Sequence, residues 1–163
     1  DRISEIREGG FKTSFTQGIN CRFLNEETAA AIASVDYRAN NMRDRRIYTA
    51  WDSKSDEKRV FRGLELLKEH GVKPRHIMVY MLVGYWPGET HDDRDYRRSR
   101  LREFGALPYP MPYTKTRELI GFQRWVLRSY DKRGISWDTW TKAKFRPRAL
   151  KDNSQIELSL AES

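Results

Sequence analysis

Four polar side chains of this sequence lie at the corners that end two β-like runs, and their types could bind a charged small molecule. Gln17, Asn20 and Arg22 belong to the corner at the end of the first run, and Asp52 closes the second. The guanidinium of an arginine forms forked hydrogen bonds with a carboxylate. A carboxylate such as that of Asp52 could accept hydrogen bonds from an amine or from ribose hydroxyls. These side chains therefore predict a ligand with a carboxylate-bearing tail.

A third run ends at Val83 and Gly84, where the backbone could contact the edge of a purine. This corner completes a predicted site for a nucleoside with a carboxylate-bearing tail. Structural roles are open to the same residues. Asp52 could cap the next helix, Arg22 could pair with Glu26 or Glu27, and the two amides could hydrogen-bond only the backbone of a turn.

The elements that must position these residues follow a regular period. The β-like runs recur about every thirty residues, at 12–18, 46–52, 77–85 and 106–114, and a helical stretch follows each of them. Strands that alternate with helices at this spacing indicate βαβ units and a parallel sheet. Ligand sites of such sheets lie at the carboxyl ends of the strands. We therefore predict an α/β fold with about four βα units and a mostly parallel sheet.

Local signals divide the chain further. Three prolines in the fourth run fit only an edge strand or an extended segment. We expect one unit over residues 1–130, then a C-terminal helical segment and loose tail over 131–163. Helices are predicted over 29–35, 55–70, 91–104 and 116–130, a polar loop over 36–45, and the loose tail itself over 147–163.

Composition narrows the setting and the partners. Cys21 is the only cysteine, which rules out an internal disulfide and makes a cytosolic setting the default. The three histidines show no tight metal-ligand spacing. Since no apolar run approaches the length of a membrane span and the first residues are polar, we expect a cytoplasmic protein with no membrane partner.

Four segments, taken in order, resemble the C-terminal half of a radical S-adenosylmethionine (SAM) domain. They are KTSFTQGINCRFLNEETA, which is similar to the superfamily's stretch with QG, a polar residue and an arginine, then RIYTAWDS, HIMVYMLVGY and GALPYPMPY. The resemblance covers about residues 1–130. It implies a partial (β/α) barrel, with SAM beside a 4Fe–4S cluster. It also implies reductive cleavage of SAM to a 5′-deoxyadenosyl radical that abstracts hydrogen from a substrate.

The resemblance also assigns residues to the cofactor. By position, the side chains at the first two corners would face the ribose or the amino-acid tail of SAM, and Val83 and Gly84 would border the adenine. The family binds its cluster through three cysteines spaced C-x3-C-x2-C, whereas this chain has Cys21 alone, at a different place. Because the cluster needs three thiolates besides SAM, we expect a missing N-terminal half that carries them. The alternative is a degenerate relative of the family.

A second hypothesis is a free-standing basic α/β module that binds nucleic acid and does no radical chemistry. The net charge is +8, from 31 Lys and Arg against 23 Asp and Glu. Basic side chains beside aromatic ones can contact phosphate and stack on bases. The strongest basic patch contains Arg97, Arg98, Arg100 and Arg102.

Overall fold

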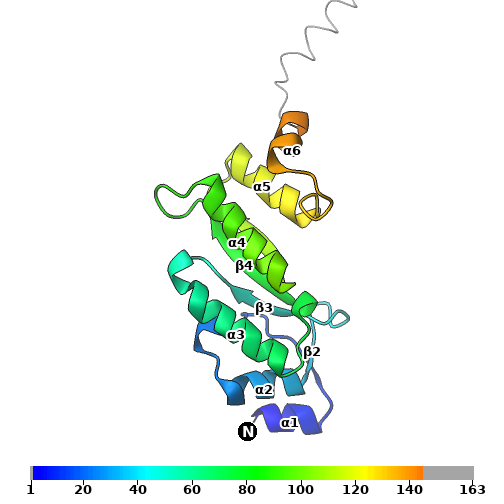
Figure 1. Cartoon of the computed structure of the whole chain (residues 1–163). Coiled ribbons are helices and arrows are strands. Elements are labelled where there is room, and N and C mark those ends of the chain that lie inside the picture. The colour runs from blue at the N-terminus through cyan, green and yellow to red at the C-terminus, as the bar shows by residue number, and fades with distance from the viewer. Residues whose placement is uncertain (1, 145–163) are drawn as a thin grey trace, which may run out of the picture.

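The computed structural model of the chain describes residues 2–144, which form a mixed α/β structure (Figure 1). The strands are β1 (Lys12–Thr13), β2 (Asp36–Tyr37), β3 (Ile47–Ala50), β4 (Ile77–Val83) and β5 (Leu107–Pro112). The helices are α1 (Arg2–Glu8), α2 (Glu26–Ser34), α3 (Glu57–Glu69), α4 (His91–Phe104), α5 (Arg117–Leu127) and α6 (Trp137–Lys144). Three short 3-10 helices are η1 (Cys21–Phe23), η2 (Lys54–Asp56) and η3 (Pro74–His76).

Every strand pair in the described part of the chain is parallel. β1 pairs with β2, and a second sheet has the order β3-β4-β5. The amide of Ile19 donates to the carbonyl of Tyr48 over 2.7 Å, which ties the segment after β1 to the edge of β3. The expected parallel α/β class is confirmed, while the described sheets do not close into a barrel.

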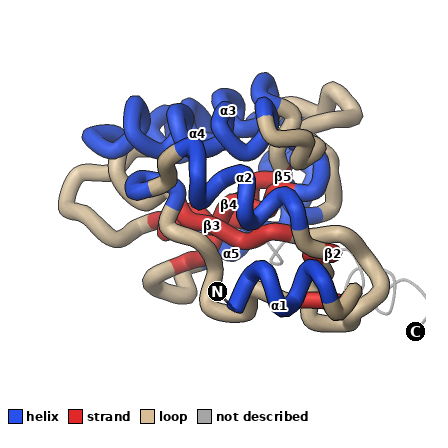
Figure 2. The backbone as a smooth tube through the Cα atoms, turned by 90° about the horizontal axis from the view of Figure 1, so that it is seen from below, coloured by secondary structure: helices blue, strands red, loops and turns tan. Residues whose placement is uncertain are grey.

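The central strand β4 has one buried face and one partly exposed face. Its alternate residues Ile77, Val79 and Met81 are fully buried. Helices α3 and α4 lie over one side of the three-stranded sheet (Figure 2). Tyr80 and Leu82 on the opposite face are only half-buried. This second face is therefore the one that can receive a ligand.

Strand β5 ends the three-stranded sheet, as its prolines predict. Pro108, Pro110 and Pro112 occupy alternate positions, so their nitrogens all lie on the side away from β4, where no ladder hydrogen bond is lost. The side-chain amide of Gln123 donates to the carbonyl of Pro110 over 2.9 Å on this side. The edge thus lacks donors for a further strand.

Several expected boundaries need correction. The loop predicted over 36–45 contains β2, which forms by pairing with β1. The first run is a strand only at its start, because the chain turns before Gly18, whose amide donates to the carbonyl of Phe15 over 3.0 Å.

The C-terminal segment contains α6, which packs on α5. The tail predicted over 147–163 lies outside the described residues. Within the described part, no helix is both long and apolar enough to span a membrane.

Candidate functional site

A cavity of about 280 Å³ opens beside the carboxyl end of β3. Four residues that the sequence singled out, Gln17, Asn20, Arg22 and Asp52, all line it. They come from two corners more than two dozen positions apart in the chain, and the parallel sheet brings them together. The remaining lining residues are Gly18, Ile19, Thr49, Ala50, Asp56 and Tyr80.

The first corner is held by its own backbone and by β3. Gly18 has a φ of 76°, which turns the chain sharply after the first run. Asn20 caps η1, since its side-chain oxygen accepts from the amide of Arg22 over 3.3 Å and from the Nε of Arg22 over 3.1 Å. Asn20 therefore orients the guanidinium as well as the turn.

The guanidinium of Arg22 also pairs with Asp56 on η2. Its Nη1 lies 3.0 Å from the Oδ2 of Asp56, and 39% of the Arg22 side chain is exposed. The pairing with Glu26 or Glu27 that the sequence left open is thus replaced by Asp56. Within the described residues the Nη2 of Arg22 has no hydrogen bond, so it is free to meet a ligand in the cavity.

The carboxylate of Asp52 joins the ends of β3 and β4. Its Oδ1 accepts the backbone amide of Leu82 over 2.8 Å. Its Oδ2 accepts no hydrogen bond from the part of the chain that the structure describes. The cap of η2 is Ser53, whose hydroxyl accepts from the amide of Ser55 over 3.3 Å. Asp52 is therefore not the helix cap, and one of its oxygens is available.

The half-buried face of the sheet contributes an aromatic wall. Tyr80 lines the cavity, and its ring stacks on Tyr48 at 5.9 Å and meets Tyr109 edge to face at 5.3 Å between centroids. Burial is the main cause that raises the pKa of the Tyr80 hydroxyl, so the phenol is neutral at physiological pH. Sequence reasoning missed Tyr80, because the near-continuous apolar run over 77–83 gives no signal of which face of the strand is open.

Val83 and Gly84 do not line this cavity. The side chain of Val83 is fully buried, and its carbonyl accepts from the amide of Tyr113 over 2.9 Å. The amide of Gly84 donates to the carboxylate of Glu89. The structure thus separates these two residues from the four that line the cavity, and it already engages the carbonyl of Val83 and the amide of Gly84.

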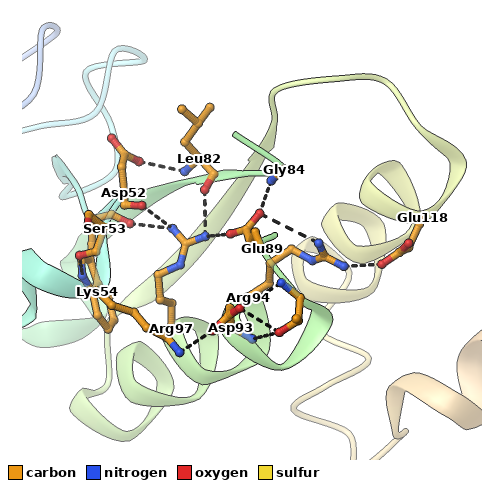
Figure 3. Close-up of polar contacts among 12 residues, drawn as sticks. Asp52, Ser53, Lys54, Leu82, Gly84, Glu89, Asp93, Arg94, Arg97 and Glu118 are labelled. Atoms are coloured by element: carbon orange, nitrogen blue, oxygen red, sulfur yellow. Dashed lines mark hydrogen bonds and ion pairs between the residues drawn. The ribbon is translucent and has the colours of Figure 1, made fainter. Parts of the chain in front are cut away.

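A buried arginine, Arg97, holds together the carboxyl ends of β3 and β4, where Asp52 lies (Figure 3). The Arg97 guanidinium donates to the carbonyls of Trp51 over 3.0 Å and Leu82 over 2.8 Å, and its Nη2 lies 2.5 Å from the Oε1 of Glu89. Both charged side chains are essentially inaccessible, at 0% and 1% exposure. Arg97 therefore connects α4 to the carboxyl ends of β3 and β4, next to the cavity.

The basic patch predicted on α4 is corrected by this arrangement. Arg97 lies inside the protein and cannot contact a phosphate backbone. The other three are used within the chain, because Arg98 and Arg102 both pair with Asp131, and Arg100 pairs with Glu57. These pairs connect α4 to the neighbouring segments of the chain.

The residues present do not fit an iron–sulfur cluster. Cys21 is buried at 1% exposure, and burial raises the pKa of its thiol to about 11. In the described ranges, no three His, Cys, Asp or Glu side chains gather as a metal site would require. A cluster with three thiolate ligands cannot be built from this one protonated thiol.

Comparison with protein-family models, with curated proteins and with solved structures gives no match.

Proposed function

We propose that this chain forms the SAM-binding side of a radical SAM enzyme. The observation that carries the proposal is the convergence of Gln17, Asn20, Arg22 and Asp52 on one cavity. These four are the residues that the resemblance to the family assigns to the ribose or the amino-acid tail of SAM. We propose in addition that the parallel strands belong to a partial (β/α) barrel. The half-buried face of the sheet is then the side that binds the ligand.

Charge in the cavity suits this ligand. Asp52 and Asp56 contribute two negative charges and Arg22 one positive charge, which leaves one net negative charge among the lining residues. SAM bears a sulfonium, an ammonium and a carboxylate, so its net charge is +1. The volume of about 280 Å³ lies just below the range of roughly 300–1,000 Å³ typical of small-molecule sites.

Individual roles follow from the free atoms. The Nη2 of Arg22 is proposed to bind the carboxylate of SAM, and the Oδ2 of Asp52 its ribose hydroxyls or ammonium. The ring of Tyr80 supplies an apolar surface. An adenine contact at Val83 and Gly84 stays a prediction, because neither residue lines the cavity.

In this family, bound SAM supplies a 5′-deoxyadenosyl radical that abstracts hydrogen from a substrate. Since Cys21 cannot supply three thiolates, the proposal for this chain is limited to binding SAM and to shaping the substrate side. Nucleic-acid binding, the second hypothesis, keeps the net charge of +8 in its support but loses the α4 arginines, which are paired.

Calorimetric titration of the chain with SAM tests the proposal. Asp52→Asn is the informative variant, because its side-chain oxygen can still accept from Leu82 while the charge is lost. We expect SAM affinity to fall about tenfold or more, as for a lost charge-assisted hydrogen bond. Asp138→Asn makes the same chemical change at an exposed position on α6 and should leave affinity unchanged. Absence of binding by the unmodified chain, or equal affinity in both variants, would overturn the assignment.

A further inference from the structure

A second cavity, of about 420 Å³, lies at the carboxyl end of β5. Met111 and Pro112 at the end of the strand form its apolar side, together with Ile120 on α5. Its volume falls within the range of roughly 300–1,000 Å³ that small-molecule sites occupy. None of the roles described so far uses this cavity.

Two cations line this cavity, and neither has a partner among residues 2–144. Lys115 lies between β5 and α5, and Arg124 lies on α5. Both are exposed, and neither side chain forms an ion pair or a hydrogen bond within the described residues. No carboxylate from this part of the chain lines the cavity. The contrast with α4 is clear, since the arginines there are paired with acidic side chains.

The aromatic wall connects the two cavities. Tyr109 lines the second cavity and contacts Tyr80, which lines the first, with 5.3 Å between the ring centroids. The two tyrosines are register partners of neighbouring parallel strands, so they lie on the same half-buried face of the sheet. Ligands in the two cavities would therefore lie on either side of this tyrosine pair.

We propose that the second cavity binds a small molecule that has a flat apolar body and a phosphate monoester group. Tyr109 and the apolar side contact the body, while Lys115 and Arg124 bind the phosphate. Two unpaired cations match the two negative charges of a phosphate monoester, and both side-chain types are established phosphate ligands. We assign this molecule as the substrate of the enzyme, and this assignment rests on the SAM-binding function proposed above.

Titration of the isotope-labelled full chain with phenyl phosphate, followed by nuclear magnetic resonance, tests the site without SAM. We expect shifts around Tyr109 and Ile120, with about tenfold weaker binding in Lys115→Met and in Arg124→Gln. Arg62→Gln is the matched control, because Arg62 is exposed on α3 and lines neither cavity. Added salt should weaken binding, as it does for exposed charge pairs.

Phenol and benzoate separate the contributions of the ligand. Both should bind more weakly than phenyl phosphate, and benzoate binding equally well would overturn the phosphate assignment. Absence of phenyl phosphate binding, or equal loss in Arg62→Gln, would overturn the site. SAM affinity should be unchanged in Arg124→Gln. If SAM fails to bind while phenyl phosphate binds as expected, the proposed function fails and the anion site stands; the reverse result removes only the anion site.

Discussion

Replacing Arg97 with alanine is expected to destabilise the protein far more than replacing an arginine one turn along the same helix. The change leaves the Glu89 carboxylate, which is 1% exposed, without its nearest cation. The remaining cation is Arg94, whose Nη1 lies 3.9 Å from the Oε2 of Glu89. It also removes the donor from the carbonyls of Trp51 and Leu82. Breaking a buried ion pair in this way costs about 3–5 kcal/mol of unfolding free energy.

Urea unfolding of both variants, followed by circular dichroism, measures the difference. The control is Arg100→Ala, whose guanidinium is 39% exposed and pairs with Glu57 and Glu103 at the surface. Exposed pairs contribute about 0–1 kcal/mol. In thermal unfolding, a loss of 1 kcal/mol lowers the Tm of a chain of this size by about 2–4 °C, so Arg97→Ala should lower Tm by roughly 6–20 °C. Equal losses in the two variants would refute the structural role of Arg97.

Three further predictions concern the interior. The thiol of Cys21, whose pKa is raised to about 11 by burial, should react with a thiol reagent at pH 8 only as fast as the protein opens; rapid labelling of the native protein would contradict its burial. Gly63→Ala should cost about 1–3 kcal/mol in urea unfolding, because a Cβ there would lie 2.1 Å from the carbonyl oxygen of Cys21; an unchanged midpoint would contradict this packing. Burial lowers the pKa of His91, which stacks on Trp137, so the folded state binds fewer protons than the unfolded one. The stability that neutral His91 contributes is present above the unfolded pKa of about 6.5 and is lost as pH falls below that value. His91→Phe should therefore flatten the pH dependence of the urea midpoint between about pH 5 and 7. An unchanged pH dependence would count against this role of His91.

Elements with long periodic patterns were predictable, and the shortest ones were not. The apolar run that becomes β4 is a local signal, and so is the capping box of α4, in which the side chains of Thr90 and Asp93 each accept the backbone amide of the other. Both elements therefore begin where expected. Strand β2 has two residues, too few to show any period, and exists because Asp36 lies in register with Lys12 of β1. A pairing of this kind depends on distant residues and leaves no local pattern.

The candidate site divides in the same way. The corner residues could be predicted because parallel sheets place the carboxyl ends of their strands at one edge. The burial of Arg97 could not, because most of its partners are backbone carbonyls of β4 and the corner after β3, which no sequence pattern reveals. The pairing of Arg22 with Asp56 was missed for a related reason, since it joins segments 34 positions apart.

The location of SAM on this chain is the most direct test of the central claim. Backbone amide resonances of the full chain should be assigned and followed during titration with SAM. We predict that the largest shifts fall on Asn20, Arg22, Asp52 and Tyr80, around the first cavity, while Asp138 on α6 stays unchanged. Shifts confined to the α4 arginines, or no shifts at millimolar SAM, would contradict the account.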